Sequence, residues 1–126
     1  MSSFGATSRR HRDSCHADLR HVLDDAIKRY NFSCIWGHRG EDRQNKAFAD
    51  GHSTKRWPNS RHNQLPSQAF DVIPYPDGFK ASDKEFYLLA SHILASAAKL
   101  GVPLRWGGHW KNLKDLAHFE LIGTRT

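Results

Sequence analysis

The residues best suited to metal chemistry are a histidine and an aspartate in the segment SRHNQLPSQAFDVIPYP and a second histidine in HFELI. His62 precedes a short apolar run that is predicted to be a strand, Asp71 lies within that run, and His118 opens the last predicted strand. Two imidazoles and one carboxylate, with a fourth position open to water, form a catalytic zinc arrangement. These three residues are the candidate metal ligands.

The alternation of side chains along a strand decides whether these residues can meet. Successive side chains point to opposite faces, so Asp71 points away from its apolar neighbours Phe70 and Val72, and His118 points away from Phe119. If the two strands pair, two imidazoles and a carboxylate can converge on the polar face. A single His is more often simply solvated, whereas an Asp among apolar strand residues needs a partner if it is buried.

A second carboxylate, Asp115, comes three residues before His118 in KDLAHFEL. A carboxylate beside an activated water can take its proton and later give it to a leaving amine. The competing interpretation is an ordinary turn Asp at a solvated helix end. The residues alone leave both interpretations open.

Size and charge limit the class of protein. The 126 residues suit one domain with a modest core. No apolar run is long enough to span a bilayer, and the N-terminal segment has no apolar stretch typical of a signal peptide. The net charge of +6 indicates a polyanionic partner, such as nucleic acid, anionic lipid or an anionic cell wall, or serves solubility alone. Cys15 and Cys34 form no C-x-x-C pair, so buried thiols are expected, and a disulfide between them stays open.

The elements that position these residues are predicted to be helices and short strands. Residues 1–13 are polar and basic and are expected to form a flexible arm, which leaves 14–126 as a single catalytic domain. A long loop is expected over 52–67. Helices are expected over 16–30, over 41–50 and from the capping box at Ser82 to Leu100, and strands over 32–36, 69–73, 104–106 and 118–122.

Helical periodicity places Ala47 and Phe48 of the second helix and Leu100 of the third on the core side. Gly107 and Gly108 are expected to form a tight turn before the last strand. Together these elements predict an α+β fold with a small, mostly antiparallel sheet flanked by helices.

Three segments resemble the motifs of one enzyme family. SRHNQLPSQAFDV resembles the S-x-H…A-x-D motif of the zinc D-Ala-D-Ala carboxypeptidases and L-alanyl-D-glutamate endopeptidases, which share the hedgehog/DD-peptidase fold. WGGHWKNLKDLAHFEL looks like the closing segment of that family, and IWGHRGEDRQNKAFADGHS is similar to its G-x-R…Q…F…G-x-S segment. The order and spacing hold from about Leu19 to Leu121, and the chain resembles single-domain phage endolysins in particular.

Carried over by position, the resemblance implies a site at the level of residues. It makes His62, Asp71 and His118 the ligands of one zinc ion per chain, Asp115 the general base and acid, and Arg39 the cation that steadies the oxyanion. The residues implied on the substrate side, as contacts or as supports of the site, are Gln44, Ser53, Ser60, Trp106 and His109.

Two departures accompany this assignment. The step from His62 to Asp71 is two residues longer than in the commoner family pattern, and many relatives carry Glu where Asp115 stands. Aspartate is one methylene shorter, so the segment that carries Asp115 must approach the metal more closely.

The resemblance implies a zinc metallopeptidase that cuts a peptide bond in the peptidoglycan stem, and in particular an L-alanyl-D-glutamate endopeptidase that serves as a phage endolysin. Such a protein is expected to be a monomer in the host cytoplasm that reaches the periplasmic cell wall after release, with no nucleic-acid partner and no stable membrane anchor. Four alternatives stay open: a D-Ala-D-Ala carboxypeptidase of wall remodelling, a small metal-dependent nuclease, a zinc-binding relative without catalysis, and a basic nucleic-acid-binding module.

Overall fold

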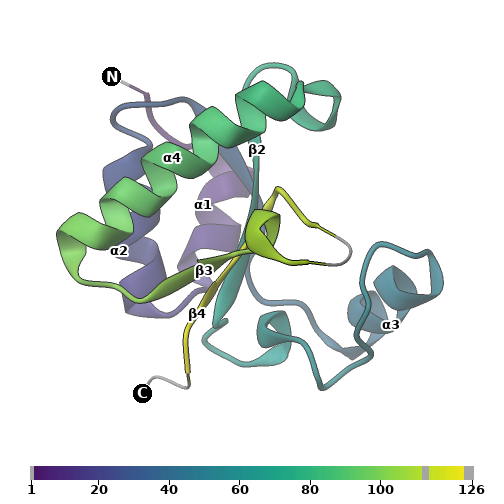
Figure 1. The fold of residues 1–126 in the computed structure, drawn as a ribbon. Coiled ribbons are helices and arrows are strands. Elements are labelled where there is room, and N and C mark those ends of the chain that lie inside the picture. Colours follow the sequence, from purple (N-terminus) through teal and green to yellow (C-terminus); the bar gives the residue numbers. More distant parts are fainter. Residues whose placement is uncertain (1, 112–113, 124–126) are drawn as a thin grey trace.

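The structure is a computed structural model that describes residues 2–111 and 114–123. Within these residues the chain forms four α-helices and four strands (Figure 1). The helices are α1 (Ala6–Asp13), α2 (Ala17–Ala26), α3 (Glu41–Ala49) and α4 (Asp83–Leu100), and the strands are β1 (Phe32–Trp36), β2 (Ala69–Pro74), β3 (Leu104–Trp106) and β4 (His118–Leu121). Short 3-10 turns lie at η1 (Arg61–Asn63), η2 (Gly78–Lys80) and η3 (Gly107–His109).

The four strands form one antiparallel sheet in the order β1-β2-β4-β3. Strand β2 is central, and its pairing with β4 sets Asp71 directly opposite His118. On its other side Asp71 pairs with Trp36, where a bulge interrupts the β1 ladder. The predicted α+β class with a small antiparallel sheet is therefore confirmed, and the register itself brings two of the candidate ligands together.

Period-two alternation explains how the sheet divides a core face from a polar face. The side chains of Phe70, Val72, Phe119 and Leu121 are all fully buried, and the rings of Phe70 and Phe119 stack at 5.4 Å between centroids. Figure 1 shows α1, α2 and α4 on the side of the sheet that these residues face, while α3 lies apart on the other side. The polar face, which carries the candidate ligands, is thus left open toward α3.

Helix α4 begins and ends where its sequence predicts. Ser82 and Glu85 form the reciprocal capping box, and Gly101 ends the helix in the left-handed conformation with a φ of 71°. The expectation that Leu100 faces the core is wrong, because 42% of its surface is exposed. Leu100 is the last residue of α4, directly before the C-cap Gly101.

Within the segment 1–13 that was expected to be a flexible arm, Ala6–Asp13 form helix α1. Phe4 packs edge-on against Phe32 with ring centroids 5.3 Å apart, and the hydroxyl of Ser8 accepts a hydrogen bond of 3.1 Å from the backbone N–H of Cys34. Phe4 lies just before the N-cap Gly5 and Ser8 lies in the first turn of α1, so the start of this segment carries both contacts with β1. The polar composition of the segment gave no indication of these contacts.

The two cysteines are separate, buried thiols, as expected. Burial raises the pKa of Cys15 to about 12, so this thiol is inert at neutral pH. Among the described residues no helix combines the length and the apolar character that crossing a bilayer requires.

Candidate active site

The three predicted metal ligands meet on the polar face of the sheet. His62 Nε2 lies 3.3 Å from Asp71 Oδ1 and 3.2 Å from His118 Nδ1, and His118 Nδ1 lies 3.0 Å from Asp71 Oδ1. His62 comes from η1, Asp71 from β2 and His118 from β4. Residues that are far apart in the sequence therefore present one nitrogen, one oxygen and one nitrogen to a common point.

The outer nitrogen of each imidazole determines which nitrogen faces that point. His62 Nδ1 donates to the carbonyl oxygen of Gly37 at 2.8 Å, and His118 Nε2 donates to Glu120 Oε1 at 2.8 Å. A carbonyl and a carboxylate can only accept, so the outer nitrogens carry the protons. The inner nitrogens are then the ones available for a metal, which is the usual arrangement of a metal-ligating histidine.

The distances fit a small tetrahedral metal ion. Zinc bonds of about 2.0–2.1 Å to nitrogen or oxygen set the ligand atoms of a tetrahedron about 3.3–3.4 Å apart. The three observed separations of 3.0–3.3 Å are close to that edge. Two nitrogens and one carboxylate oxygen are also a donor set that zinc accepts, so the residues present fit the group.

The neighbouring groups of the cluster shift the pKa values of Asp71 and His118. Burial opposes ionisation of Asp71, but the two imidazoles beside it outweigh that effect and hold its pKa well below its usual range. Burial also disfavours a charged His118, yet its bonds to Asp71 and Glu120 raise its pKa to about 9. Without a metal, both of its ring nitrogens therefore carry protons at neutral pH, and a metal must displace the inner proton. Asp71 is therefore a carboxylate throughout the neutral range, as a ligand must be.

The cluster lies at the base of a cleft of about 620 Å³. Asp115 lines this cleft, and burial, followed by the negative charge of Asp71, raises the pKa of Asp115. The backbone of Asp115 is bound directly to Gly107: its N–H donates to the Gly107 carbonyl at 3.1 Å, and a Cβ on Gly107 would lie 2.3 Å from the Asp115 carbonyl oxygen. The glycine turn before the last strand thus forms the support on which Asp115 rests.

Arg39 also lines the cleft and is almost completely buried. Its Nη2 bonds to Asp71 Oδ2 at 3.2 Å, which is the carboxylate oxygen that does not face the imidazoles. Its Nη1 donates to Gln44 Oε1 at 3.1 Å, and its guanidinium lies 4.7 Å from the ring centre of Trp36. Arg39 is therefore fixed in place beside the metal-ligand cluster.

The other predicted polar residues divide between the cleft and its support. Ser53 and Ser60 line the cleft, and Ser60 Oγ accepts from the His62 backbone N–H at 3.2 Å. Gln44 is fully buried behind Arg39 and binds Ser53 Oγ at 3.0 Å, so it supports the site and does not reach the cleft. Gln44 is also the buried residue of α3, whereas Ala47 and Phe48, which were expected on the core side, are only half-buried.

Two predicted substrate contacts lie elsewhere. Trp106 is a core residue: it is 8% exposed, stacks on Phe119 and donates to the Leu116 carbonyl at 2.9 Å. The alternation along β3 turns Trp106 to the apolar face, which explains the wrong assignment. His109 is exposed and packs against Trp106, outside the residues that line the cleft.

Two side chains of the site, Trp36 and Glu120, were not identified from the sequence. Trp36 and Trp110 form apolar walls of the cleft, and the ring of Trp110 lies 5.3 Å from that of His118. Glu120 orients His118 and is itself approached at 3.7 Å by Arg61 and by an arginine of β3. Glu120 lies two residues after His118 in the same strand, and that spacing was the available signal.

A small antiparallel sheet that presents two imidazoles and a carboxylate in an open cleft, beside a second carboxylate, has the arrangement of a metal-dependent hydrolase. The profile of the phage L-alanyl-D-glutamate peptidase family matches residues 1–122. The chain belongs to this family of peptidoglycan peptidases.

A solved structure agrees with the family assignment. The crystal structure of the L-Ala D-Glu endopeptidase ChiX of Serratia marcescens is 30% identical in sequence, superposes with a TM-score of 0.80, and covers 96% of this chain and 91% of its own. No curated protein sequence matches the chain. The predicted family, fold class and peptidase function are therefore confirmed, while the identity of the metal and the roles of single residues stay proposals.

Proposed function

We propose that this enzyme hydrolyses the bond between L-alanine and D-glutamate in the peptidoglycan stem, with one zinc ion held by His62, Asp71 and His118. The observation that supports a metal site is the convergence of two imidazole nitrogens on one carboxylate oxygen. The outer N–H of each imidazole already has a hydrogen-bond acceptor. Family membership favours the endopeptidase over the D-Ala-D-Ala carboxypeptidase that the sequence left open.

The chemistry divides between the metal and the chain. Zinc held at this point supplies Lewis acidity, which activates water and polarises the scissile carbonyl. Asp115 takes the proton of the attacking water and then delivers it to the nitrogen of the departing amine, since it lines the cleft beside the ligands. Arg39 holds Asp71 and keeps a positive charge beside the carbonyl oxygen as negative charge develops there.

The remaining lining positions the substrate. Trp36 and Trp110 offer flat apolar walls to the peptide, while Ser53 and Ser60 are placed to bond its backbone. Zinc-bearing sites of this kind leave one coordination position free for water, and the open cleft gives the stem peptide access to it.

The biological setting is proposed from the family. A phage peptidase that accumulates in the infected cell and reaches the wall once the membrane is permeabilised acts in host-cell lysis. The net charge of +6 suits an anionic envelope. Among the described residues no membrane-spanning helix anchors the enzyme elsewhere.

Mass spectrometry of digested sacculi, combined with metal analysis of the purified protein, tests this function. We expect about one zinc per chain and peptides that begin with D-glutamate. Release of free D-alanine without such peptides would assign the carboxypeptidase activity instead. Full activity after exhaustive chelation would refute the metal site.

A further inference from the structure

A second cavity, of about 650 Å³, lies next to the catalytic cleft. The two share Trp36, whose side chain lines both. The cavity is bounded by the end of α1 and the start of α3, and none of the proposed ligands or Asp115 lines it. Trp36 is therefore the side chain that the cleft and this cavity have in common.

Cations face the cavity from two helices. Arg10 comes from α1 and Arg43 from α3. The guanidinium of Arg43 lies 5.7 Å from the ring centre of Trp36, and in the described part of the chain neither arginine forms an ion pair with a carboxylate. Burial and then the charges of Arg10 and Arg43 lower the pKa of His11, which lines the same cavity.

Two acids face the same space. Glu41 and Asp42, in the first turn of α3, line the cavity, and neither forms an ion pair within the described residues. With Arg10 and Arg43 they make a lining of balanced charge in which cations and anions remain unpaired. A lone anion or a lone cation would meet repulsion from half of these groups, whereas a ligand with both charges satisfies each kind.

We infer that this second cavity is a specificity subsite for a zwitterionic residue of the stem peptide: a diamino acid whose side chain ends in an amine and a carboxylate. This inference rests on the proposed function, because the residue must follow D-glutamate along the bound stem. The arginines bind the carboxylate, Glu41 and Asp42 bind the ammonium group, and Trp36 packs against the aliphatic part of the side chain.

The test compares two synthetic stem peptides on the zinc-loaded enzyme. One carries the diamino acid with free amine and carboxylate after L-Ala-D-Glu, and the other carries alanine at that position. For the natural chain we expect the alanine peptide to show a KM about 3- to 10-fold higher, as expected for a few partly exposed charge contacts, with kcat little changed.

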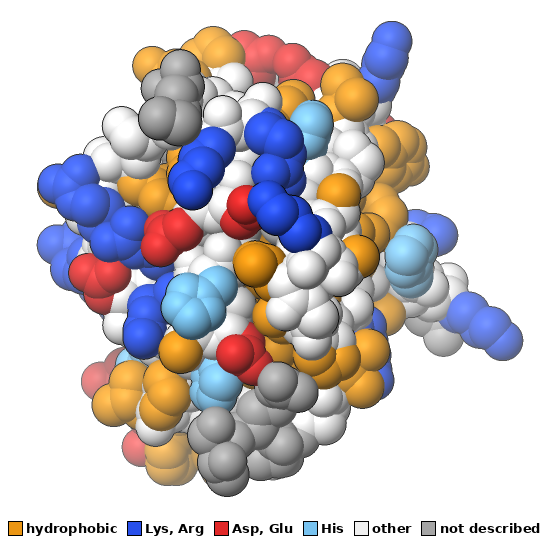
Figure 2. Space-filling view, turned by 90° about the vertical axis from the view of Figure 1, so that its left-hand side faces the viewer, with side chains coloured by type: hydrophobic (Ala, Val, Ile, Leu, Met, Phe, Trp, Pro, Cys, Tyr) orange, Lys and Arg blue, Asp and Glu red, His pale blue; other side chains and the backbone are white. Residues whose placement is uncertain are grey.

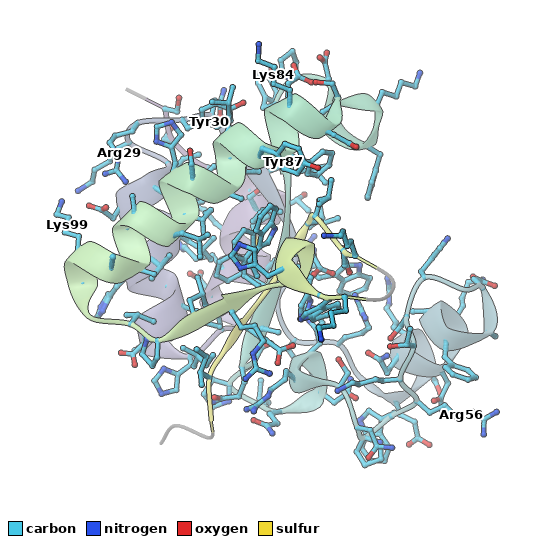
Figure 3. All side chains as sticks on the ribbon, viewed as in Figure 1. Arg29, Tyr30, Arg56, Lys84, Tyr87 and Lys99 are labelled. Carbon is cyan, nitrogen blue, oxygen red and sulfur yellow. The ribbon has the colours of Figure 1, made fainter. Side chains whose placement is uncertain are left out.

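Two double variants test whether the difference in KM between the two peptides comes from this cavity. Arg10→Gln with Arg43→Gln, and Glu41→Gln with Asp42→Asn, should each bring the ratio of the two KM values toward one. The matched control removes two exposed positive charges elsewhere, with Lys28→Gln and Lys84→Gln; Figure 3 shows Lys84 at the N-terminal end of α4, away from α3. The control should keep the natural ratio.

Binding without turnover gives an independent readout. In the presence of a chelator, calorimetric titration with the diamino peptide should show weaker binding to both cavity variants than to the Lys28/Lys84 control. Equal KM values for the two peptides on the natural chain, or a natural ratio in both cavity variants, would overturn the subsite. Failure of the natural chain to cleave either peptide would instead refute the proposed function.

Discussion

At the scale of single residues, the site depends on groups that never touch the metal. Each imidazole is oriented by an oxygen on its far side, His62 by the carbonyl of Gly37 and His118 by the carboxylate of Glu120. The first acceptor belongs to the backbone and cannot be removed by a side-chain substitution. The second can be, and this difference makes Glu120 the direct test of how the ligands are held.

Replacing Glu120 should weaken metal binding while the fold remains. Glu120→Ala removes the acceptor of His118 Nε2, and loss of such an outer partner typically lowers metal affinity about 10- to 100-fold. Glu120→Gln keeps an oxygen acceptor and should recover part of the loss. A competition titration with a zinc-binding dye measures both. Arg105→Gln is the control, since Arg105 approaches only the other oxygen of Glu120, at 3.7 Å; equal zinc affinity in all variants would contradict this role.

Asp115 should matter for turnover and not for metal content. Asp115→Asn keeps the shape of the side chain but removes the proton acceptor, so kcat should fall about 10²- to 10⁴-fold while the protein still carries one zinc. His62→Ala, in contrast, should lose the metal as well. Turnover measured together with zinc content separates the two cases. Near-natural turnover in Asp115→Asn would assign the base to another group.

Asp71 could be singled out from the sequence because its type is unusual for its position, whereas Arg39, Gln44, Ser53 and Ser60 were assigned only through the resemblance to the family. Asp71 is a charged residue in an apolar strand, and alternation alone set it on the face that His118 shares. The Gly37 contact was not visible, because a backbone carbonyl has no sequence signature. The position of Trp106 was misjudged because its proximity in sequence to the site outweighed the alternation along β3.

At the scale of elements, α1 is part of the support of the site. A Cβ on Gly37 would lie 2.2 Å from the carbonyl oxygen of His11 and 2.3 Å from Ser14 Oγ. The same Ser14 hydroxyl accepts from the His38 backbone N–H at 2.8 Å. The end of α1 therefore presses against the residue whose carbonyl orients His62.

Gly37→Ala should consequently both destabilise the fold and loosen the metal. Overpacking of this kind costs about 1–3 kcal/mol, and the displaced carbonyl should lower zinc affinity. Denaturant unfolding and a zinc titration are the measurements. Gly40→Ala is the matched control three residues away, because nothing lies within 4 Å of its Cβ position. The contact with α1 would be unimportant if the two variants unfolded at the same denaturant concentration.

The elements themselves were predictable to different degrees. Helix α4 was placed well because its capping box and its terminal glycine are local signals that tertiary contacts do not override. Helix α1 was missed because its sequence is polar at most positions: Ser8 is its one buried residue, and the buried Phe4 lies just before the helix. Its stability comes from β1, which the local pattern cannot show.

At the scale of the whole molecule, one acidic residue joins two helices and contributes stability that is lost in acid. Asp25 of α2 accepts from Ser96 at 2.7 Å and Lys99 at 3.0 Å, both of α4, and from Arg29 at 3.0 Å. The hydroxyl of Ser96, followed by Lys99 and Arg29, lowers the pKa of Asp25 well below its usual range. Figure 3 shows Arg29 and Lys99 on the side where α2 and α4 pack together.

Asp25→Asn should therefore lower stability by about 1–3 kcal/mol at neutral pH, the range for hydrogen bonds to a charged group. Because the folded-state pKa is depressed, the contribution is fully present above the unfolded pKa of about 3.9 and is lost as the pH falls below it. The difference between natural chain and variant, measured by denaturant unfolding from pH 7 to pH 3, should shrink at the acid end. Asp50→Asn, which breaks an exposed pair with Lys46, should change little; a difference for Asp25→Asn that grew toward pH 3 would contradict the assignment.

The distribution of surface charge suits an extended anionic target better than a nucleic acid bound along one row of cations. Figure 2 shows Lys and Arg side chains on the face toward the viewer interleaved with Asp and Glu. Nucleic-acid-binding domains instead gather their cations along one groove or helix. On this face the cations are therefore dispersed among acids, which suits the attraction to an anionic envelope proposed above.

The central place of Asp71 has a consequence for how long the enzyme survives. Its strand lies between β1 and β4, and its two partner histidines arrive from a loop and from the next strand. An ion gripped by all three fastens the middle of the sheet, so unfolding must release it. Free zinc at 100 times its dissociation constant would add about 2.7 kcal/mol of resistance to heat and proteases. With zinc bound as proposed, the enzyme would be most durable where free zinc is plentiful.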